Sequence, residues 1–183
     1  VRTGFTILFK DMESALTNVD GLSALTSVGG TLHISGCDNL ANVNGLTSLT
    51  TVGGNLNIKY CNALADVDGF SSLLSLGGEL NIDHCDALLN VDGLSSLTSL
   101  GGHLNILHCP VLTDIDGLSA LTDVGEQIHI RNCGALVSIS GFSSLTSLNG
   151  NVTLWSNHQL TSIDGFQNLT NIEELWINDC PSL

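Results

Sequence analysis

The sequence predicts an α/β repeat solenoid, in which 24-residue coils stack along one axis with a parallel β-sheet on one side and short 3₁₀, helical or irregular turns on the other. Three observations predict this fold: the regular spacing of the cysteines, a recurrent pattern of apolar residues, and the composition of the chain. Of the 183 residues, 43% are hydrophobic but only 4% are aromatic. Leu, Val and Ile must therefore fill the core in many similar layers, which favours repetition over one irregular globule.

The cysteines show the 24-residue period most clearly, because they recur with it from Cys37 to Cys133. A further step of the same length reaches Asn157, and a slightly shorter step reaches Cys180. A fixed period of this kind is typical of stacked repeats. We expect an internal ladder of buried thiols that bond weakly to the backbone of the next turn. Disulfides between neighbouring coils are geometrically allowed, but an unbroken run of five cysteines cannot pair completely. The ladder consists of Cys37, Cys61, Cys85, Cys109, Cys133, Asn157 and Cys180.

The apolar residues repeat with the same period. From Leu80, one unit reads LNIDHCDALLNVDGLSSLTSLGGH, with apolar residues at −5, −3, +3, +6, +9, +12 and +15 relative to the cysteine. The first two predict a strand whose alternate side chains point outward. The later spacing of three suits short 3₁₀ turns or irregular coil. We expect all seven columns of apolar residues to face the core.

Each coil carries an Asp-Gly dipeptide or a variant of it at +7, as in Asp92-Gly93. We expect the aspartate to cap the short turn that follows by accepting backbone N–H groups. Stacked carboxylates at +5 and +7 could instead bind calcium. Capping explains the same residues and the chain has no calcium-loop motif, so no metal is expected. A Gly-Gly pair before several strands, such as Gly101-Gly102, predicts a left-handed or closely packed backbone.

Residues 16–183 are predicted to form about seven of these repeats in a single domain, after a partial N-terminal cap in residues 1–15 that is built on Phe5, Ile7 and Phe9. The chain stops shortly after a strand, at Cys180-Pro-Ser-Leu183, without a polar cap. The ends of a solenoid expose a hydrophobic layer. We therefore expect the chain to be truncated at its C-terminus, or to be covered there through end-to-end or C-terminal-edge association.

The stretch LNILHCPVLTDIDGL, Leu104 to Leu118, resembles the strand-and-ladder signature of leucine-rich repeats, in which a buried Asn or Cys follows the strand. The Cys followed by x-x-Leu-Thr-Asp is similar to the cysteine-containing class, and Asn157 in register fits the interchange. Gly stands where that family usually has Leu, three residues before the first strand Leu. In this respect the chain looks more like the receptor L-domain subgroup. The resemblance covers about residues 16–183 and implies a right-handed coil and a receptor-ectodomain-like module, but no particular ligand.

Charge is sparse and mostly negative, with 4 Lys and Arg against 18 Asp and Glu and a formal net charge of −14. Nucleic acids and anionic membranes attract clusters of basic residues, so neither is an expected partner. No apolar run reaches about 18 residues, so this segment is not expected to insert into a membrane. Abundant Ser, Thr and Asn with almost no Lys favour an extracellular or cell-surface location.

Three outward columns, at −4, −2 and −1, change chemistry from coil to coil and carry both Trp, the single Tyr and four of the six His. Such rings must lie outward once the core is aliphatic. Exposed aromatic residues among Arg and His are also typical of binding hot spots, and the sheet of a solenoid is its usual binding surface. We expect a protein or glycan ligand here and no cofactor. The predicted ligand-binding residues are Trp155, Trp176, Arg131, Tyr60, His108, His84, Lys59, Leu107 and His129.

Other functions are less well supported by the sequence. The chain has no nucleophile elbow, phosphate loop or zinc-helix motif, and the carboxylates of the strands are too scattered to form a pair, so no catalytic residues and no enzyme are predicted. Zinc binding by His84-Cys85 or His108-Cys109 is disfavoured, because Cys should point inward and His outward. A structural spacer without its own ligand is the main alternative. A lesser one is ice or surface binding by the threonines at +13, which local backbone hydrogen bonds also explain.

Overall fold

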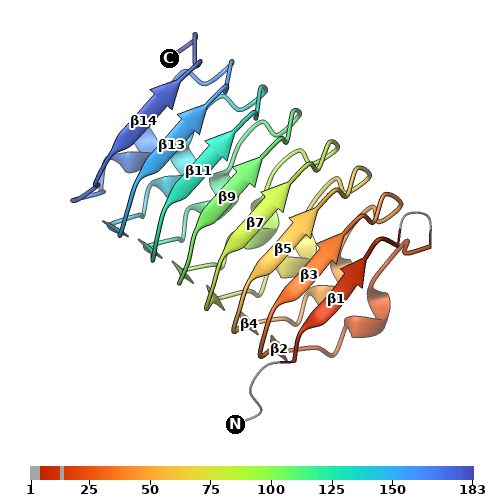
Figure 1. Cartoon of the computed structure of the whole chain (residues 1–183). Coiled ribbons are helices and arrows are strands. Elements are labelled where there is room, and N and C mark those ends of the chain that lie inside the picture. The colour runs from red at the N-terminus through yellow and green to blue at the C-terminus, as the bar shows by residue number, and fades with distance from the viewer. Residues whose placement is uncertain (1–4, 13–14) are drawn as a thin grey trace.

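The computed structural model describes residues 5–12 and 15–183. Residues 1–4, 13 and 14 of the predicted N-terminal cap lie outside the described residues. The repeated coils stack side by side, so that each strand lies next to the corresponding strand of the neighbouring coil (Figure 1). The predicted α/β repeat solenoid is confirmed.

The wider of the two sheets carries the strands that the apolar pattern predicts. Within the described residues it has eight parallel strands in the order β1-β3-β5-β7-β9-β11-β13-β14. Strands pair in register: Leu80 lies opposite Leu104, one full period away, and Val152 lies opposite Leu175 in the shortened last coil. The strands are β1 (Ile7–Lys10), β3 (Leu32–Ser35), β5 (Leu56–Lys59), β7 (Leu80–Asp83), β9 (Leu104–Leu107), β11 (Ile128–Arg131), β13 (Val152–Trp155) and β14 (Leu175–Asn178). Strand β1 comes from the segment predicted as a cap and adds a further strand to the sheet.

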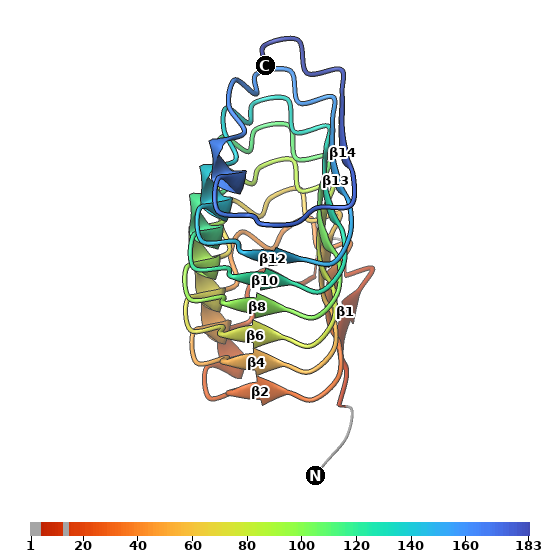
Figure 2. The ribbon, with the colours of Figure 1, turned by 90° about the vertical axis from the view of Figure 1, so that its left-hand side faces the viewer.

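A second, narrow parallel sheet was not predicted. Figure 2 shows it as a ladder of very short strands next to the row of turns. Two-residue strands are too short for an alternating pattern to appear in the sequence. In the described residues they are β2 (Ser27–Val28), β4 (Thr51–Val52), β6 (Ser75–Leu76), β8 (Ser99–Leu100), β10 (Asp123–Val124) and β12 (Ser147–Leu148).

Short 3₁₀ helices form the side of the coil away from the wide sheet. None of the described helices is long and apolar enough to cross a membrane. The helices are η1 (Asp20–Leu22), η2 (Asn44–Leu46), η3 (Asp68–Phe70), η4 (Asp92–Leu94), η5 (Asp116–Leu118), η6 (Ser140–Phe142) and η7 (Asp164–Phe166).

The predicted capping role of the aspartates at +7 is wrong. No residue at the N-terminal cap position of these helices makes a capping side-chain hydrogen bond, and the aspartate is itself the first helical residue. The side chain two residues earlier takes the role instead. Asn90 Oδ1 accepts the backbone N–H of Asp92 at 3.1 Å, and Asp66 Oδ1 accepts that of Asp68 at 3.2 Å. This is an Asx turn, in which a short polar side chain bonds to its own backbone two residues on.

The glycine pairs before the strands allow close packing. A methyl group at Gly53 would meet the carbonyl oxygen of Gly29, in the preceding coil, at 2.5 Å. The Gly-Gly pairs were expected to adopt either a left-handed or a closely packed backbone, and at Gly53 the backbone is closely packed. Left-handed backbone occurs mainly at the residue that follows each strand of the wide sheet.

The core is one continuous column between the two sheets and the 3₁₀ helices, and it consists mostly of aliphatic side chains with the cysteines, Phe70 and Phe142 among them. The seven predicted inward columns are confirmed in the coil of Cys85, where each apolar residue is at most 1% exposed. These residues are Leu80, Ile82, Leu88, Val91, Leu94, Leu97 and Leu100. Packing is weaker in the last coil, where strand β14 is exposed along its whole length.

The cysteines form the predicted ladder as free thiols, five of them buried and Cys180 partly buried. Each thiol contacts a backbone carbonyl of its own coil, and four also reach back along the stack: Cys85 Sγ, for example, lies 3.8 Å from the carbonyl oxygen of Ile58 in the preceding coil, not in the next one as expected. Burial raises the pKa of the Cys61 thiol to about 11 and that of Cys85 to about 12. These thiols therefore stay protonated at neutral pH, which makes them poor nucleophiles and metal ligands.

Asn157 occupies the cysteine position of its coil and is completely buried. Its Oδ1 accepts the backbone N–H of Cys133 at 3.1 Å, and its Nδ2 donates to the carbonyl oxygen of Ile130 at 2.9 Å. The amide thus binds the same carbonyl position that the thiols contact in other coils. The interchange of Cys and Asn in this column has a direct structural reason.

Candidate ligand-binding face

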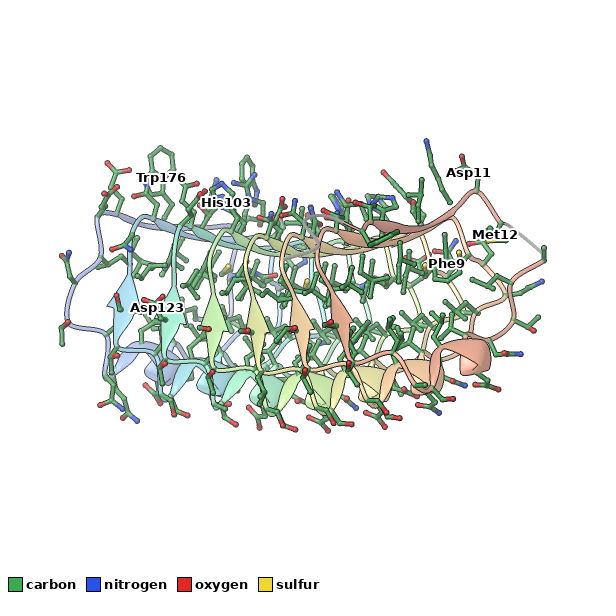
Figure 3. All side chains as sticks on the ribbon, turned by 90° about the horizontal axis from the view of Figure 1, so that it is seen from below. Phe9, Asp11, Met12, His103, Asp123 and Trp176 are labelled. Carbon is green, nitrogen blue, oxygen red and sulfur yellow. The ribbon has the colours of Figure 1, made fainter. Side chains whose placement is uncertain are left out.

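The outward side of the wide sheet is here called the strand face. It comprises the side chains at −6, −4 and −2 of each coil, together with the residue at −1 that ends each strand. Seen along the sheet, His103 and Trp176 stand on this side of the molecule, and the 3₁₀ helices lie on the opposite side (Figure 3). Every residue of the strand face recurs at the spacing of the strands, so its side chains form rows across the stack.

The −1 positions have an unusual backbone. Residues there adopt a positive φ, for example 54° at Tyr60, 52° at His84 and 50° at His108. Gly, Asn, Asp and His tolerate this left-handed conformation best, whereas the bulkier Tyr60 adopts it at a higher energetic cost. The same conformation ends every strand of the wide sheet in the described residues, so it belongs to the repeat and sets the direction of each −1 side chain.

The nine residues predicted to bind a ligand all lie on the strand face. Three of them expose large rings: Tyr60 is 50% exposed, Trp155 46% and Trp176 62%. His108 is also exposed. The remaining five are half-buried, and they are Lys59, His84, Leu107, His129 and Arg131.

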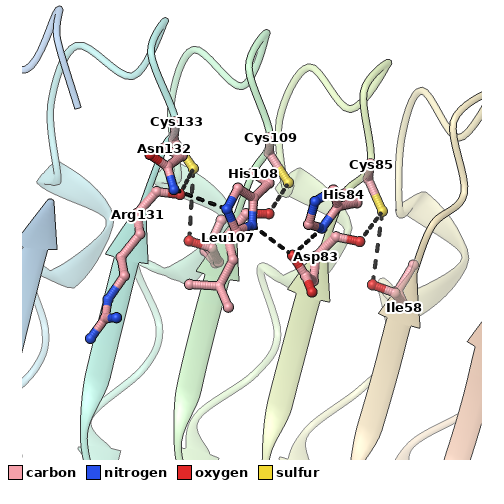
Figure 4. Close-up of polar contacts among 11 residues, drawn as sticks. Ile58, Asp83, His84, Cys85, Leu107, His108, Cys109, Arg131, Asn132 and Cys133 are labelled. Carbon is pink, nitrogen blue, oxygen red and sulfur yellow. Dashed lines mark hydrogen bonds and ion pairs between the residues drawn. The ribbon is translucent and has the colours of Figure 1, made fainter. Parts of the chain in front are cut away.

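One group of these residues lies at the carboxyl ends of strands β5, β7 and β9. The rings of Tyr60, His84 and His108 stack in a row, with centroids 4.9 Å and 4.2 Å apart. Asp83 lies against the two imidazoles: its Oδ1 is 2.7 Å from His84 Nδ1 and 3.0 Å from His108 Nδ1 (Figure 4). On the far side of the same ring, His108 Nε2 is 3.0 Å from Asn132 Nδ2.

A second group surrounds Arg131 on strand β11. Its guanidinium carbon lies 5.9 Å from the ring centroid of Trp155 on the next strand, a cation–π arrangement. Arg131 Nη2 also lies 3.4 Å from His129 Nδ1. Burial lowers the pKa of His129, and the positive charges of Arg131 and His103 lower it further, so this imidazole is neutral at neutral pH. A cationic and aromatic patch results.

Trp176 is fixed at the end of the stack. Its Nε1 donates to Glu174 Oε2 at 2.8 Å, which leaves the ring faces free for contact. In register it lies beside Thr153, one column away from Trp155. The two tryptophans are therefore diagonal neighbours on the strand face.

Three buried polar atoms have no hydrogen-bond partner among the described residues, and all of them belong to the strand face. They are Asn81 Oδ1, Arg131 Nε and Asn151 Oδ1. Unpaired buried polar atoms are rare in folded proteins because each costs the free energy of a lost hydrogen bond. Their gathering on one surface sets that surface apart from the rest of the described chain.

Sequence reasoning missed the residues that connect the predicted ones. Asp83 was counted only among scattered carboxylates, and Asn132 was not singled out. Glu79 was counted in the same way, yet its Oε1 accepts hydrogen bonds from Asn81 and Asn105. A signal existed, since Asp83 directly precedes His84, and one repeat period places His108 in the neighbouring coil.

The threonines at +13 lie on the other side of the coil, beside the narrow sheet. Thr122 Oγ1 donates to the carbonyl oxygen of Thr98 at 3.1 Å, and Thr50 Oγ1 donates to that of Thr26 at 2.9 Å. Each hydroxyl thus directs its proton to the preceding coil. This geometry favours the local hydrogen-bonding interpretation of the threonines.

The carboxylates of the acidic column at +7 act on one another. The pKa of Asp92 is raised by burial and then by the neighbouring carboxylates Asp114, Asp68 and Asp116. Mutual repulsion along the row is therefore present. The Asx turns account for the carboxylates and amides at +5.

The described residues form no pocket. No known protein family model matches the chain, and no curated protein matches it. The functional inference therefore rests on the surface itself.

Proposed function

We propose that this chain is a leucine-rich-repeat solenoid of the cysteine-containing, receptor L-domain-like kind. In this proposal it acts as a non-enzymatic binding or adhesion module, which recognises a protein or glycan through the strand face. An extracellular or cell-surface location is part of the proposal. The 24-residue coil, one strand of the wide sheet per coil and the Cys/Asn ladder support the family assignment.

The observation that carries the binding role is the set of unpaired buried atoms on the strand face. Asn81 Oδ1, Arg131 Nε and Asn151 Oδ1 each lack a partner among the described residues, and each belongs to the same outer surface. A ligand that displaces the side chains covering these atoms would satisfy them with its own donors and acceptors. Leaving such atoms unpaired costs about 1–3 kcal/mol each, so a partner that pairs them gains affinity.

The exposed rings support the same role. Trp, Tyr and Arg dominate binding hot spots. Trp and Tyr offer a large rigid surface at low entropic cost, and Arg offers a cationic group with several N–H donors. Trp155 and Arg131 form a cation–π pair. Tyr60 is the N-terminal member of the row of stacked rings that continues with His84 and His108. Between them the strand face offers both ring faces and hydrogen-bonding groups, which suits an extended protein or sugar chain.

The test is a screen of the chain against a glycan array and a library of displayed extracellular proteins, followed by affinity measurements on any partner found. A triple variant, Tyr60→Ala, Arg131→Ala and Trp155→Ala, removes the predicted anchors. If each anchor contributes about 1–2 kcal/mol, the affinity should fall by more than about 100-fold.

A matched control removes exposed apolar side chains elsewhere. Leu74, Leu89 and Val137 are about as exposed as Tyr60 and Trp155 and lie off the strand face. Their triple alanine variant should bind normally. Equal binding by wild type and the Tyr60, Arg131 and Trp155 variant would contradict the proposal, and would favour a spacer solenoid without its own ligand.

A further inference from the structure

We propose that Asp83, His84 and His108 form a binding site for a divalent transition-metal ion, with Zn²⁺ as the best match. The three residues come from the carboxyl ends of strands β7 and β9 and the positions that follow them. This proposal does not depend on a protein or glycan ligand. It concerns the metal ion alone.

The donor atoms already converge. One ligand atom from each residue lies within 4.8 Å of the others, and Asp83 Oδ1 is 2.7 Å and 3.0 Å from the two Nδ1 atoms. Zn²⁺ binds imidazole nitrogen and carboxylate oxygen at about 2.0–2.2 Å, which puts neighbouring ligands of a tetrahedral site roughly 3.3 Å apart. The two distances from Asp83 Oδ1 to the imidazole nitrogens would have to lengthen by only a few tenths of an ångström to admit the ion.

The set of residues is also chemically suitable. Two imidazoles and one carboxylate form a ligand set that zinc accepts, and three protein ligands leave a fourth position open. The side chain of Asp83 is 14% exposed, whereas those of His84 and His108 are 41% and 44% exposed. The carboxylate of Asp83 therefore lies deeper than the two imidazoles, and the fourth coordination position of the metal would face solvent.

The neighbours hold both rings in place. Tyr60 stacks on His84 and His84 stacks on His108, so neither imidazole can rotate freely without losing ring contact. Metal at His108 Nδ1 requires the proton on Nε2, which would then donate to the side-chain oxygen of Asn132 after a rotation of that amide. Hydrogen bonds of this kind to the second nitrogen orient metal-binding histidines.

The cysteines do not compete for the ion at this site. Cys85 directly follows His84, but its thiol is completely buried in the ladder and lies inside the core. The metal site thus differs from the His-Cys zinc site that was considered from the sequence and judged unfavourable, because it contains no cysteine. It also departs from the expectation of no metal.

The experiment titrates the purified chain with Zn²⁺ by calorimetry and with Co²⁺ by absorption spectroscopy. We expect one ion per chain and no thiolate-to-metal charge-transfer band. Side-chain NMR spectra should show His84 and His108 shifting together. His108→Gln removes one of three ligands and should weaken binding by about 100-fold or more, since even the loss of a supporting hydrogen bond costs 10–100-fold.

His158→Gln is the matched control. His158 Nε2 lies 3.2 Å from Asp179 Oδ2, an exposed His–carboxylate pair that lacks a second imidazole partner among the described residues. This variant should bind Zn²⁺ as the wild type does. The proposal is overturned if Zn²⁺ does not bind, if His108→Gln binds it equally well, if both variants lose it alike, or if a thiolate band shows that cysteine is the ligand. Circular dichroism of each variant confirms the fold.

Discussion

The two sides of each coil differ in the partners of their side-chain hydrogen bonds. Beside the narrow sheet, threonine hydroxyls donate to the carbonyl oxygen of the preceding coil, and the contact repeats from Thr50 to Thr170 with one exception, at Leu74. On the strand face, side chains bond mainly to one another, and each contact is particular to its coil, as with Asp83 and the two histidines. A position repeats when its partner is backbone, because backbone recurs in every coil. Where the partner is another side chain, each coil can differ.

The largest expected effect breaks coil-to-coil contact on the turn side. A methyl group at Gly93 would overlap the carbonyl oxygen of Val67 in the preceding coil. Gly93→Ala should therefore lower the free energy of unfolding by about 3 kcal/mol or more, measured by urea denaturation.

Gly21 is the equivalent glycine of an earlier coil and supplies the control. An added methyl group there meets no atom within 4 Å. Gly21→Ala should change stability by less than about 0.5 kcal/mol. Similar losses in both variants would mean that steric contact between coils is not the cause.

The next effect concerns the ladder. Asn157→Ala leaves the backbone N–H of Cys133 and the carbonyl oxygen of Ile130 buried without their side-chain partner. We expect a loss of about 2–4 kcal/mol in the free energy of unfolding. Asn157→Cys restores the period and should cost clearly less. If the two variants are equally stable, the hydrogen bonds of the amide do not explain its presence.

A smaller effect compares threonines on the two sides. Thr122→Val removes the hydrogen bond to the carbonyl oxygen of Thr98 while keeping the shape of the side chain. The expected loss is about 0.5–1.5 kcal/mol. Thr153 lies on the strand face, and Thr153→Val should cost less in the same thermal or urea denaturation. The reverse order would contradict the assigned role of the threonine column.

The smallest effect is on pH dependence. Burial, then Arg131 and His103, lower the folded-state pKa of His129 from its ordinary value of 6.5. Below that value the unfolded chain binds more protons than the folded chain, so stability falls as the pH drops through 6.5 and below. His129→Asn should make the free energy of unfolding depend less on pH in this range. An unchanged slope would show that His129 does not contribute.

Much of the fold could be predicted from the sequence because residues at the same offset in successive coils share the same buried environment. Leu80, Ile82 and Val91 are buried as their spacing requires, and so is Cys85. The narrow sheet and the Asx turns escaped prediction, since two-residue strands carry no alternation and Asn90 and Asp92 both look like capping residues. For the candidate site, the sequence placed the nine residues on one face but could not show Asp83 between two imidazoles.

The sequence by itself determined the period, the inward columns and which residues face outward, since these follow from the regular recurrence of apolar side chains. Only the tertiary structure decided which outward groups meet. Contacts such as Asp83 with His108, or Arg131 with Trp155, join residues about one period apart. Their geometry depends on strand register, on the left-handed backbone at the −1 positions and on rotamers that packing selects. The register and the −1 positions follow the 24-residue period, but the rotamers differ from coil to coil and leave no periodic mark in the chain.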